Sequence, residues 1–347
     1  MKTKTIYLTI FILSFSYAGQ SKDKRKHETE KADNPVFRAY ELRMNGKADQ
    51  ALNLLEQNLK EDTANALALY ELARTRLHYR SGELEGPALL DYLKSTIEKA
   101  IKLDPDNIIY YPFAIVIYDM NLDWNKGSGK ENEWIQRKSA IYQKMLELNP
   151  DKAKIKLEML EICLKNPDLL HCDEDELKGL VTEIKETDEV LGAMASNKLN
   201  KDIENDYEFW MEMVNKNPTN SDALMEAGDA SEEEEGVEYY AKAIRLDPDK
   251  AGAACWLIKY FFFSIKEEPE FAEKYVSYAE KIAEAFLTTD KYPPLQAYVI
   301  ACMSRIYNIA DNEEKGKEYW DRAERIDTFM IDFPVHPPIE LFTSLSQ

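Results

Sequence analysis

The stretch Gly236–Lys250, GVEYYAKAIRLDPDK, decides how the rest of this sequence folds. Its apolar residues recur at steps of three and four, which is typical of one face of an α-helix. Pro248 ends that helix, because the residue before a proline is disfavoured in the α region. Nearly the same pattern stands at Thr96–Asn107, TIEKAIKLDPDN, and a shorter one at Lys144–Lys152, KMLELNPDK. Several such helices, each closed by Asp-Pro or Asn-Pro, predict a stacked helical repeat.

Composition agrees with an all-α chain. The 347 residues are 44% hydrophobic, with only 12 glycines and 14 prolines. That is enough apolar material for a sizeable core and few of the turn residues that a β-sandwich needs. Length alone would allow two or three domains. A repeat protein grows by adding units, so we expect one elongated domain.

The amino terminus has the features of an export signal. A basic start precedes the uncharged, mostly apolar run Thr5–Ala18, which ends in small residues. The run is shorter than the roughly 20 residues of a membrane span. We expect residues 1–18 to be a cleaved signal peptide, with an uncleaved anchor as the alternative. Residues 19–33 are expected to be a charged, disordered tether. The mature protein would then be periplasmic or extracellular, with no membrane insertion.

The first hairpin shows which repeat family the chain resembles. Asn34–Met44 and Lys47–Lys60 read as two helices joined by a turn at Asn45 and Gly46. Small residues stand where the two helices would cross, and large ones where neighbouring pairs would meet. The spacing resembles that of the tetratricopeptide repeat, and rests on Ala39, Gly46, Ala51 and Leu55.

This resemblance covers roughly residues 34–327 and sets the expected architecture. It implies a right-handed α-solenoid of antiparallel helix hairpins, with about six to seven units. We expect second helices at Leu93–Leu103 and Trp134–Leu148, each after a long loop. Pro150 to Pro218 spans twice 34 residues, and the helices expected there are Lys152–Lys165, Glu174–Glu186, Asp188–Leu199 and Asp202–Asn217. Residues 328–347 contain three prolines and are predicted to form a capping tail.

The inner face of such a solenoid is the candidate binding surface. In the family, the first helix of each pair lines the concave groove. Tyrosine and arginine dominate the positions expected there, and both residue types often carry interface energy. The alternative is that the tyrosines pack between helices. The candidate residues for concave-face binding are Tyr40, Arg43, Tyr70, Arg74, His78, Tyr111, Tyr118, Tyr298 and Arg305.

Patterns for catalysis, metal or cofactor binding are missing from the sequence. The four histidines are scattered, and no zinc-binding or nucleophile motif occurs. We therefore expect no enzyme, no cofactor and no metal. Cys163 and Cys172 are close in sequence and form a possible disulfide in an oxidising compartment, with two free thiols as the alternative. Cys255 and Cys302 are expected to remain thiols.

These observations predict a non-catalytic scaffold that binds a protein or peptide through its concave face. The net charge of −20, or −22 once the signal leaves with Lys2 and Lys4, disfavours nucleic acid. One alternative is a structural subunit of a cell-envelope assembly that uses its convex or terminal surfaces. Another is a carbohydrate- or small-ligand-binding protein or an enzyme, which would need an enclosed pocket.

Overall fold

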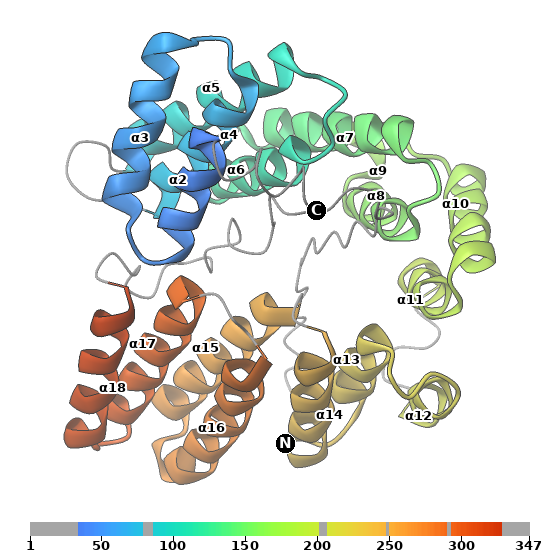
Figure 1. Cartoon of the computed structure of the whole chain (residues 1–347). Helices are drawn as coiled ribbons and strands as arrows, with labels where there is room; N and C mark the ends of the chain where they lie inside the picture. The colour runs from blue at the N-terminus through green and yellow to red at the C-terminus, as the bar shows by residue number, and fades with distance from the viewer. Residues whose placement is uncertain (1–33, 79–85, 201–206, 248–249, 290–292, 328–347) are drawn as a thin grey trace, which may run out of the picture.

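The computed structural model describes residues 34–78, 86–200, 207–247, 250–289 and 293–327, and every regular element in these ranges is helical (Figure 1). The predicted signal peptide, tether and capping tail lie outside these ranges. The helices are α2 (Pro35–Met44), α3 (Ala48–Glu61), α4 (Ala66–His78), α5 (Gly86–Leu103), α6 (Tyr110–Trp124), α7 (Glu131–Leu148), α8 (Ala153–Lys165), α9 (Pro167–Leu170), α10 (Glu174–Thr187), α11 (Glu189–Asn200), α12 (Tyr207–Lys216), α13 (Ser221–Ala230), α14 (Glu233–Leu246), α15 (Ala251–Glu267), η2 (Pro269–Phe271), α16 (Ala272–Thr289), α17 (Pro293–Ile309) and α18 (Glu313–Ile326).

Consecutive helices pack as hairpins, which confirms the predicted α-solenoid. The α13–α14 pair shows how the sequence specifies one unit. The Asn220 side chain caps α13 by accepting a hydrogen bond from the Ala223 amide at 3.0 Å. The two helices cross at glycines: a Cβ atom on Gly236 would lie 2.6 Å from the Gly228 carbonyl oxygen. Backbones approach this closely only where side chains are absent.

The middle of the chain departs from the expected pair of regular units. α10 packs against both α8 and α11, whereas α12 packs against α13. The four helices predicted between Pro150 and Pro218 are present as α8, α10, α11 and α12, with the first residues predicted for α12 outside the described part of the chain. They do not pair as two regular 34-residue hairpins. The capping box of Asp173 and Glu176 starts α10 at Glu174, as predicted. α8 packs against both α10 and α11.

Two of the predicted second helices begin earlier than expected. α5 begins at Gly86, not at Leu93, and α7 begins at Glu131, not at Trp134. Pro87 stands in the first turn of α5, where a proline costs no hydrogen bond. Leu89, in the added turn, is buried at 6% exposure, so packing favours the longer helix.

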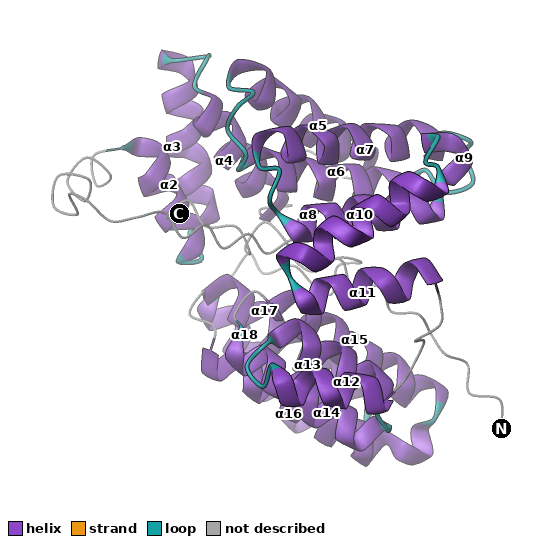
Figure 2. Ribbon diagram, turned by 90° about the vertical axis from the view of Figure 1, so that its right-hand side faces the viewer, coloured by secondary structure: helices purple, strands orange, loops and turns teal. Residues whose placement is uncertain are grey.

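The solenoid closes on itself. In Figure 1 the chain runs round a ring, and α17 and α18 return to lie next to α2 and α3; Figure 2 shows the same proximity from the side. Tyr40 and Met44 of α2 belong to one hydrophobic cluster with residues of α14, α15, α16 and α17. The first and last units are therefore in contact. Among the described residues, no helix has both the length and the apolar character required to cross a membrane.

Candidate binding surfaces on the inner face

A buried group of charged residues lies where α2 packs against α4. The Glu71 carboxylate accepts hydrogen bonds from Arg43 Nε at 2.7 Å and from Arg74 Nη1 at 3.3 Å. All three side chains have 0% exposure. The Tyr40 ring lies 5.6 Å from the Arg43 guanidinium carbon and 5.9 Å from that of Arg74. We call Arg43, Glu71 and Arg74 the arginine triad.

The sequence selected both arginines but missed Glu71. A glutamate three residues before an arginine on one helix face is a common surface pair, so its position alone gave no signal. Because Glu71 is buried, it differs from a surface glutamate: a buried charge requires a charge of opposite sign nearby. The triad thus sits inside the fold in this conformation, as do Tyr70 at 1% and His78 at 2% exposure.

The tyrosines of α6 face other helices. The Tyr118 hydroxyl is 3.1 Å from Glu98 Oε1 on α5, and the Tyr111 hydroxyl donates to the Pro105 carbonyl at 2.5 Å. Burial, followed by the nearby Glu98 carboxylate, raises the pKa of Tyr118 to about 12. Both side chains therefore pack between helices, which corresponds to the alternative considered for them.

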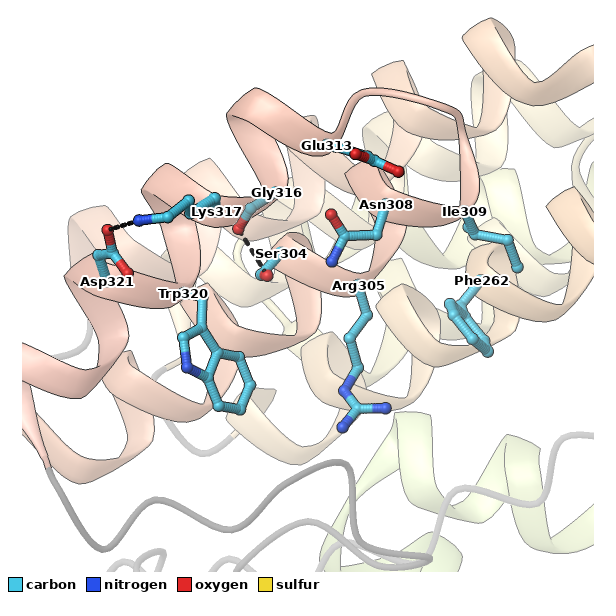
Figure 3. Close-up of a pocket in the computed structure, with 10 residues that line it drawn as sticks. All are labelled: Phe262, Ser304, Arg305, Asn308, Ile309, Glu313, Gly316, Lys317, Trp320 and Asp321. Atoms are coloured by element: carbon cyan, nitrogen blue, oxygen red, sulfur yellow. Dashed lines mark hydrogen bonds and ion pairs between the residues drawn. The ribbon is translucent and has the colours of Figure 1, made fainter.

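A pocket lies between α15, α17 and α18. It has a volume of about 640 Å³ and is lined by Phe262, Ser304, Arg305, Asn308, Ile309, Glu313, Gly316, Lys317, Trp320 and Asp321. Figure 3 shows the Trp320 indole and the Arg305 guanidinium extending to the same side of neighbouring helices. Trp320, Arg305 and Phe262 are half-buried and Asn308 is exposed. Tyr298, on the same helix as Arg305, is buried at 2% exposure.

The close contact between α17 and α18 shapes this pocket. The Ser304 hydroxyl donates to the Gly316 carbonyl at 2.7 Å (Figure 3). A Cβ atom on Gly316 would lie 3.1 Å from the Ser304 carbonyl oxygen and closer still to the Asn308 side chain. Glycine at this position lets α18 approach α17 until Trp320 and Arg305 share one surface. Asn308 and Phe262 were not predicted, although Asn308 follows the predicted Arg305 by three residues and so lies on the same helix face.

A mixed cluster of charges joins α8, α11 and α13. Lys198 Nζ lies 3.0 Å from Glu161 Oε1, and Lys250 pairs with Asp222. Burial, and then the Glu161 carboxylate, raises the pKa of Glu158 to about 7. Burial, and then Asp229, raises the pKa of Glu226 to about 7. With pKa values raised into this range, we expect the charge of this bend of the ring to change near neutral pH.

The cysteines divide into one bridge and two thiols. Cys163 and Cys172 form a disulfide with Cα atoms 5.8 Å apart. Cys255 and Cys302 are buried and free, and burial raises the pKa of the Cys302 thiol to about 12. In the described part of the chain, no three His, Cys, Asp or Glu side chains are placed to hold a metal ion.

Known proteins resemble this chain in fold alone. No family model and no curated protein matches the sequence. YrrB, described as a TPR protein with an unusual peptide-binding site, is 17% identical over 64% of this chain and 90% of its own, with a TM-score of 0.34. A tetratricopeptide repeat protein from Parabacteroides merdae is 11% identical over 90% and 97%, with a TM-score of 0.40. A thermophilic TPR protein from Thermus thermophilus is 17% identical over 61% and 97%, with a TM-score of 0.35. Likeness at this level says nothing about which surface binds.

Proposed function

We propose that this protein is a non-catalytic scaffold that binds a protein or an extended peptide through its inner face. The observation that carries the proposal is the pocket between α15, α17 and α18. It places an aromatic ring of Trp320, a cation of Arg305 and an amide of Asn308 on one surface. Tryptophan and arginine are frequent binding hot spots. An asparagine amide matches the donor and acceptor of a peptide backbone.

The proposed place of action is outside the cytoplasm, in the periplasm or the extracellular space. The apolar run Thr5–Ala18 supports it, and so does the Cys163–Cys172 disulfide, because such bonds persist in oxidising compartments. The excess of acidic residues favours protein partners over nucleic acid, whose phosphates it would repel.

The test is a comparison of captured proteins. The mature protein is immobilised and exposed to a cell-envelope extract, beside the double variant Arg305→Ala/Trp320→Ala and the control Trp124→Ala. Trp124 is 59% exposed at the end of α6, away from the pocket residues. A partner of the pocket is retained by wild type and by the control and is lost by the double variant. Equal capture by all three proteins rejects the pocket as the binding surface.

A second candidate function is a structural subunit that docks through an end of the helices. Phe263 and Phe271 favour it, because they are 46% and 49% exposed near the end of the α15–α16 pair. Exposed aromatic side chains of this size often mark a contact with another protein. Capture that survives Arg305→Ala/Trp320→Ala and is lost in Phe263→Ser/Phe271→Ser would favour this alternative.

A further inference from the structure

Where the ring closes, the end of α18 meets the turn between α2 and α3. Asp327 caps α18, and its Oδ2 lies 2.9 Å from Nε2 of His78, the last residue of α4. The two side chains are 0% and 2% exposed. A charged or polar pair this deeply buried contributes only while both partners are present. The contact joins the last helix to the second hairpin.

Gly46 shows that this approach is built into the sequence. It ends α2 with φ +71°, a left-handed conformation that favours glycine. A Cβ atom there would lie 2.8 Å from the Ile326 carbonyl oxygen and 3.6 Å from the Asp327 Cβ. Gly129 has a similar φ of +79°, yet nothing lies within 4 Å of its Cβ position. Gly46 therefore serves both the turn and the contact with α18.

Each side of this contact is folded by its own neighbours. α2 and α3 pack against α4, while α17 packs against α15 and α16 and α18 packs against α17. In stacked repeats, stability comes mainly from contacts between successive units. The closing contact is small by comparison, so it can separate without unfolding either end.

We propose that Tyr40, Met44, Gly46, His78, Ile326 and Asp327 form a latch that closes the solenoid into a ring and controls access to the arginine triad. Tyr40 links the two parts, because its ring packs near both guanidiniums while it shares a hydrophobic cluster with α15 and α17. Opening the latch uncovers Tyr40 and exposes the triad behind it. The gating role rests on the proposed inner-face binding, whereas the latch itself does not.

A double-mutant cycle tests whether the ring is closed in solution. His78→Ala, Asp327→Ala and the double variant are compared with wild type by urea denaturation followed by circular dichroism. We expect the two single losses of unfolding free energy not to add, because residues in contact show a coupling energy and His78 and Asp327 are 2.9 Å apart. The control pairs Asp327→Ala with Glu98→Ala, whose ion-pair partner is Arg137, and these losses should add. Additive losses in the cycle of His78 and Asp327 would overturn the latch.

A second experiment opens the latch and measures how accessible the arginines of the triad become. Asparagine tolerates the left-handed conformation, so Gly46→Asn adds mainly the collision with Ile326, and Gly129→Asn supplies the same backbone change without it. We expect Gly46→Asn to raise the radius of gyration in small-angle scattering. Modification of Arg43 and Arg74 by phenylglyoxal should rise severalfold. Identical scattering and identical modification in both variants would refute gating. Because neither readout uses a partner, a failed capture experiment leaves the latch intact.

Discussion

Glu71 and Arg43 lie on different helices of the first two units, with Arg43 Nε 2.7 Å from Glu71 Oε1 and both side chains fully buried. We predict that Glu71→Ala lowers the free energy of unfolding by about 3–5 kcal/mol, because it leaves two buried guanidiniums without the carboxylate between them. Urea denaturation followed by circular dichroism measures the change.

A surface pair provides the control for Glu71. Glu98 and Arg137 are 2.8 Å apart but 36% and 38% exposed. Glu98→Ala should cost less than about 1 kcal/mol, as is usual for exposed ion pairs. Equal losses of unfolding free energy in Glu71→Ala and Glu98→Ala would show that the triad does not act as a buried charge cluster.

The Gly228–Gly236 crossing gives a prediction about repeat geometry. Gly236→Ala places a methyl group 2.6 Å from the Gly228 carbonyl and should lower the melting temperature, because the helices must separate. Gly179→Ala is the matched change, since its Cβ meets nothing within 4 Å in α10. It should stabilise by roughly 0.5–1 kcal/mol through helix propensity. If the melting temperatures of Gly236→Ala and Gly179→Ala shift in the same direction, the close approach of the two helices at Gly236 is not what limits the side chain there.

Ala243, in the same hairpin, tests whether the core has space for a larger side chain. It is 0% exposed and belongs to the cluster that contains Leu224 and Trp210. Ala243→Trp should unfold the α13–α14 pair, because a close-packed core has no space for an indole. Hydrogen exchange of the α14 backbone amides measures this unfolding, and their protection should be lost in the variant. Protection equal to that of wild type would show that the site accommodates the indole ring.

Stability should fall as pH rises from about 5 to 8 in part because of Glu158 and Glu226. Their folded pKa values of about 7 lie above the ordinary value of 4.5. Between the two values the folded state binds more protons than the unfolded state, so raising the pH favours unfolding. Above the folded pKa the effect levels off.

Replacing the ionisable group isolates this contribution. Glu158→Gln keeps the shape without the charge and should stabilise the protein at pH 8 by on the order of 1 kcal/mol. At pH 5 it should change little, because Glu158 is already protonated in the folded state. Melting temperatures measured across this range decide the matter. A Glu158→Gln curve parallel to that of wild type would count against a raised pKa.

The Cys163–Cys172 bridge encloses a short loop, and its loss should cost roughly 2–3 kcal/mol in the chain-entropy model. Cys172→Ser, at the half-buried end, should match wild type treated with reductant. The same variant should show no further change on reduction. Thermal unfolding with and without dithiothreitol provides the comparison, and a reductant effect that persists in Cys172→Ser would place the redox sensitivity elsewhere.

Burial separates the candidate residues that sequence reasoning placed on one surface. Tyr70 and Arg74 were chosen from their position on a first helix, and the structure places both within the core of the first two units. Arg305, chosen by the same rule, lines the pocket with Trp320. Sequence spacing gives the direction of a side chain about its helix axis. It does not tell how far neighbouring helices extend over that side chain, so it could not distinguish these cases.

By itself the sequence determined the helices and the close crossings at small residues, and it determined their pairing in hairpins except between Pro150 and Pro218. Those features depend on contacts within one unit or with the next, and local spacing records such contacts. Only the tertiary structure decided that Gly46 meets Ile326 and that His78 meets Asp327. Small rotations between successive units add up along a solenoid. Their sum brings the first unit to the last, and no single repeat encodes that sum.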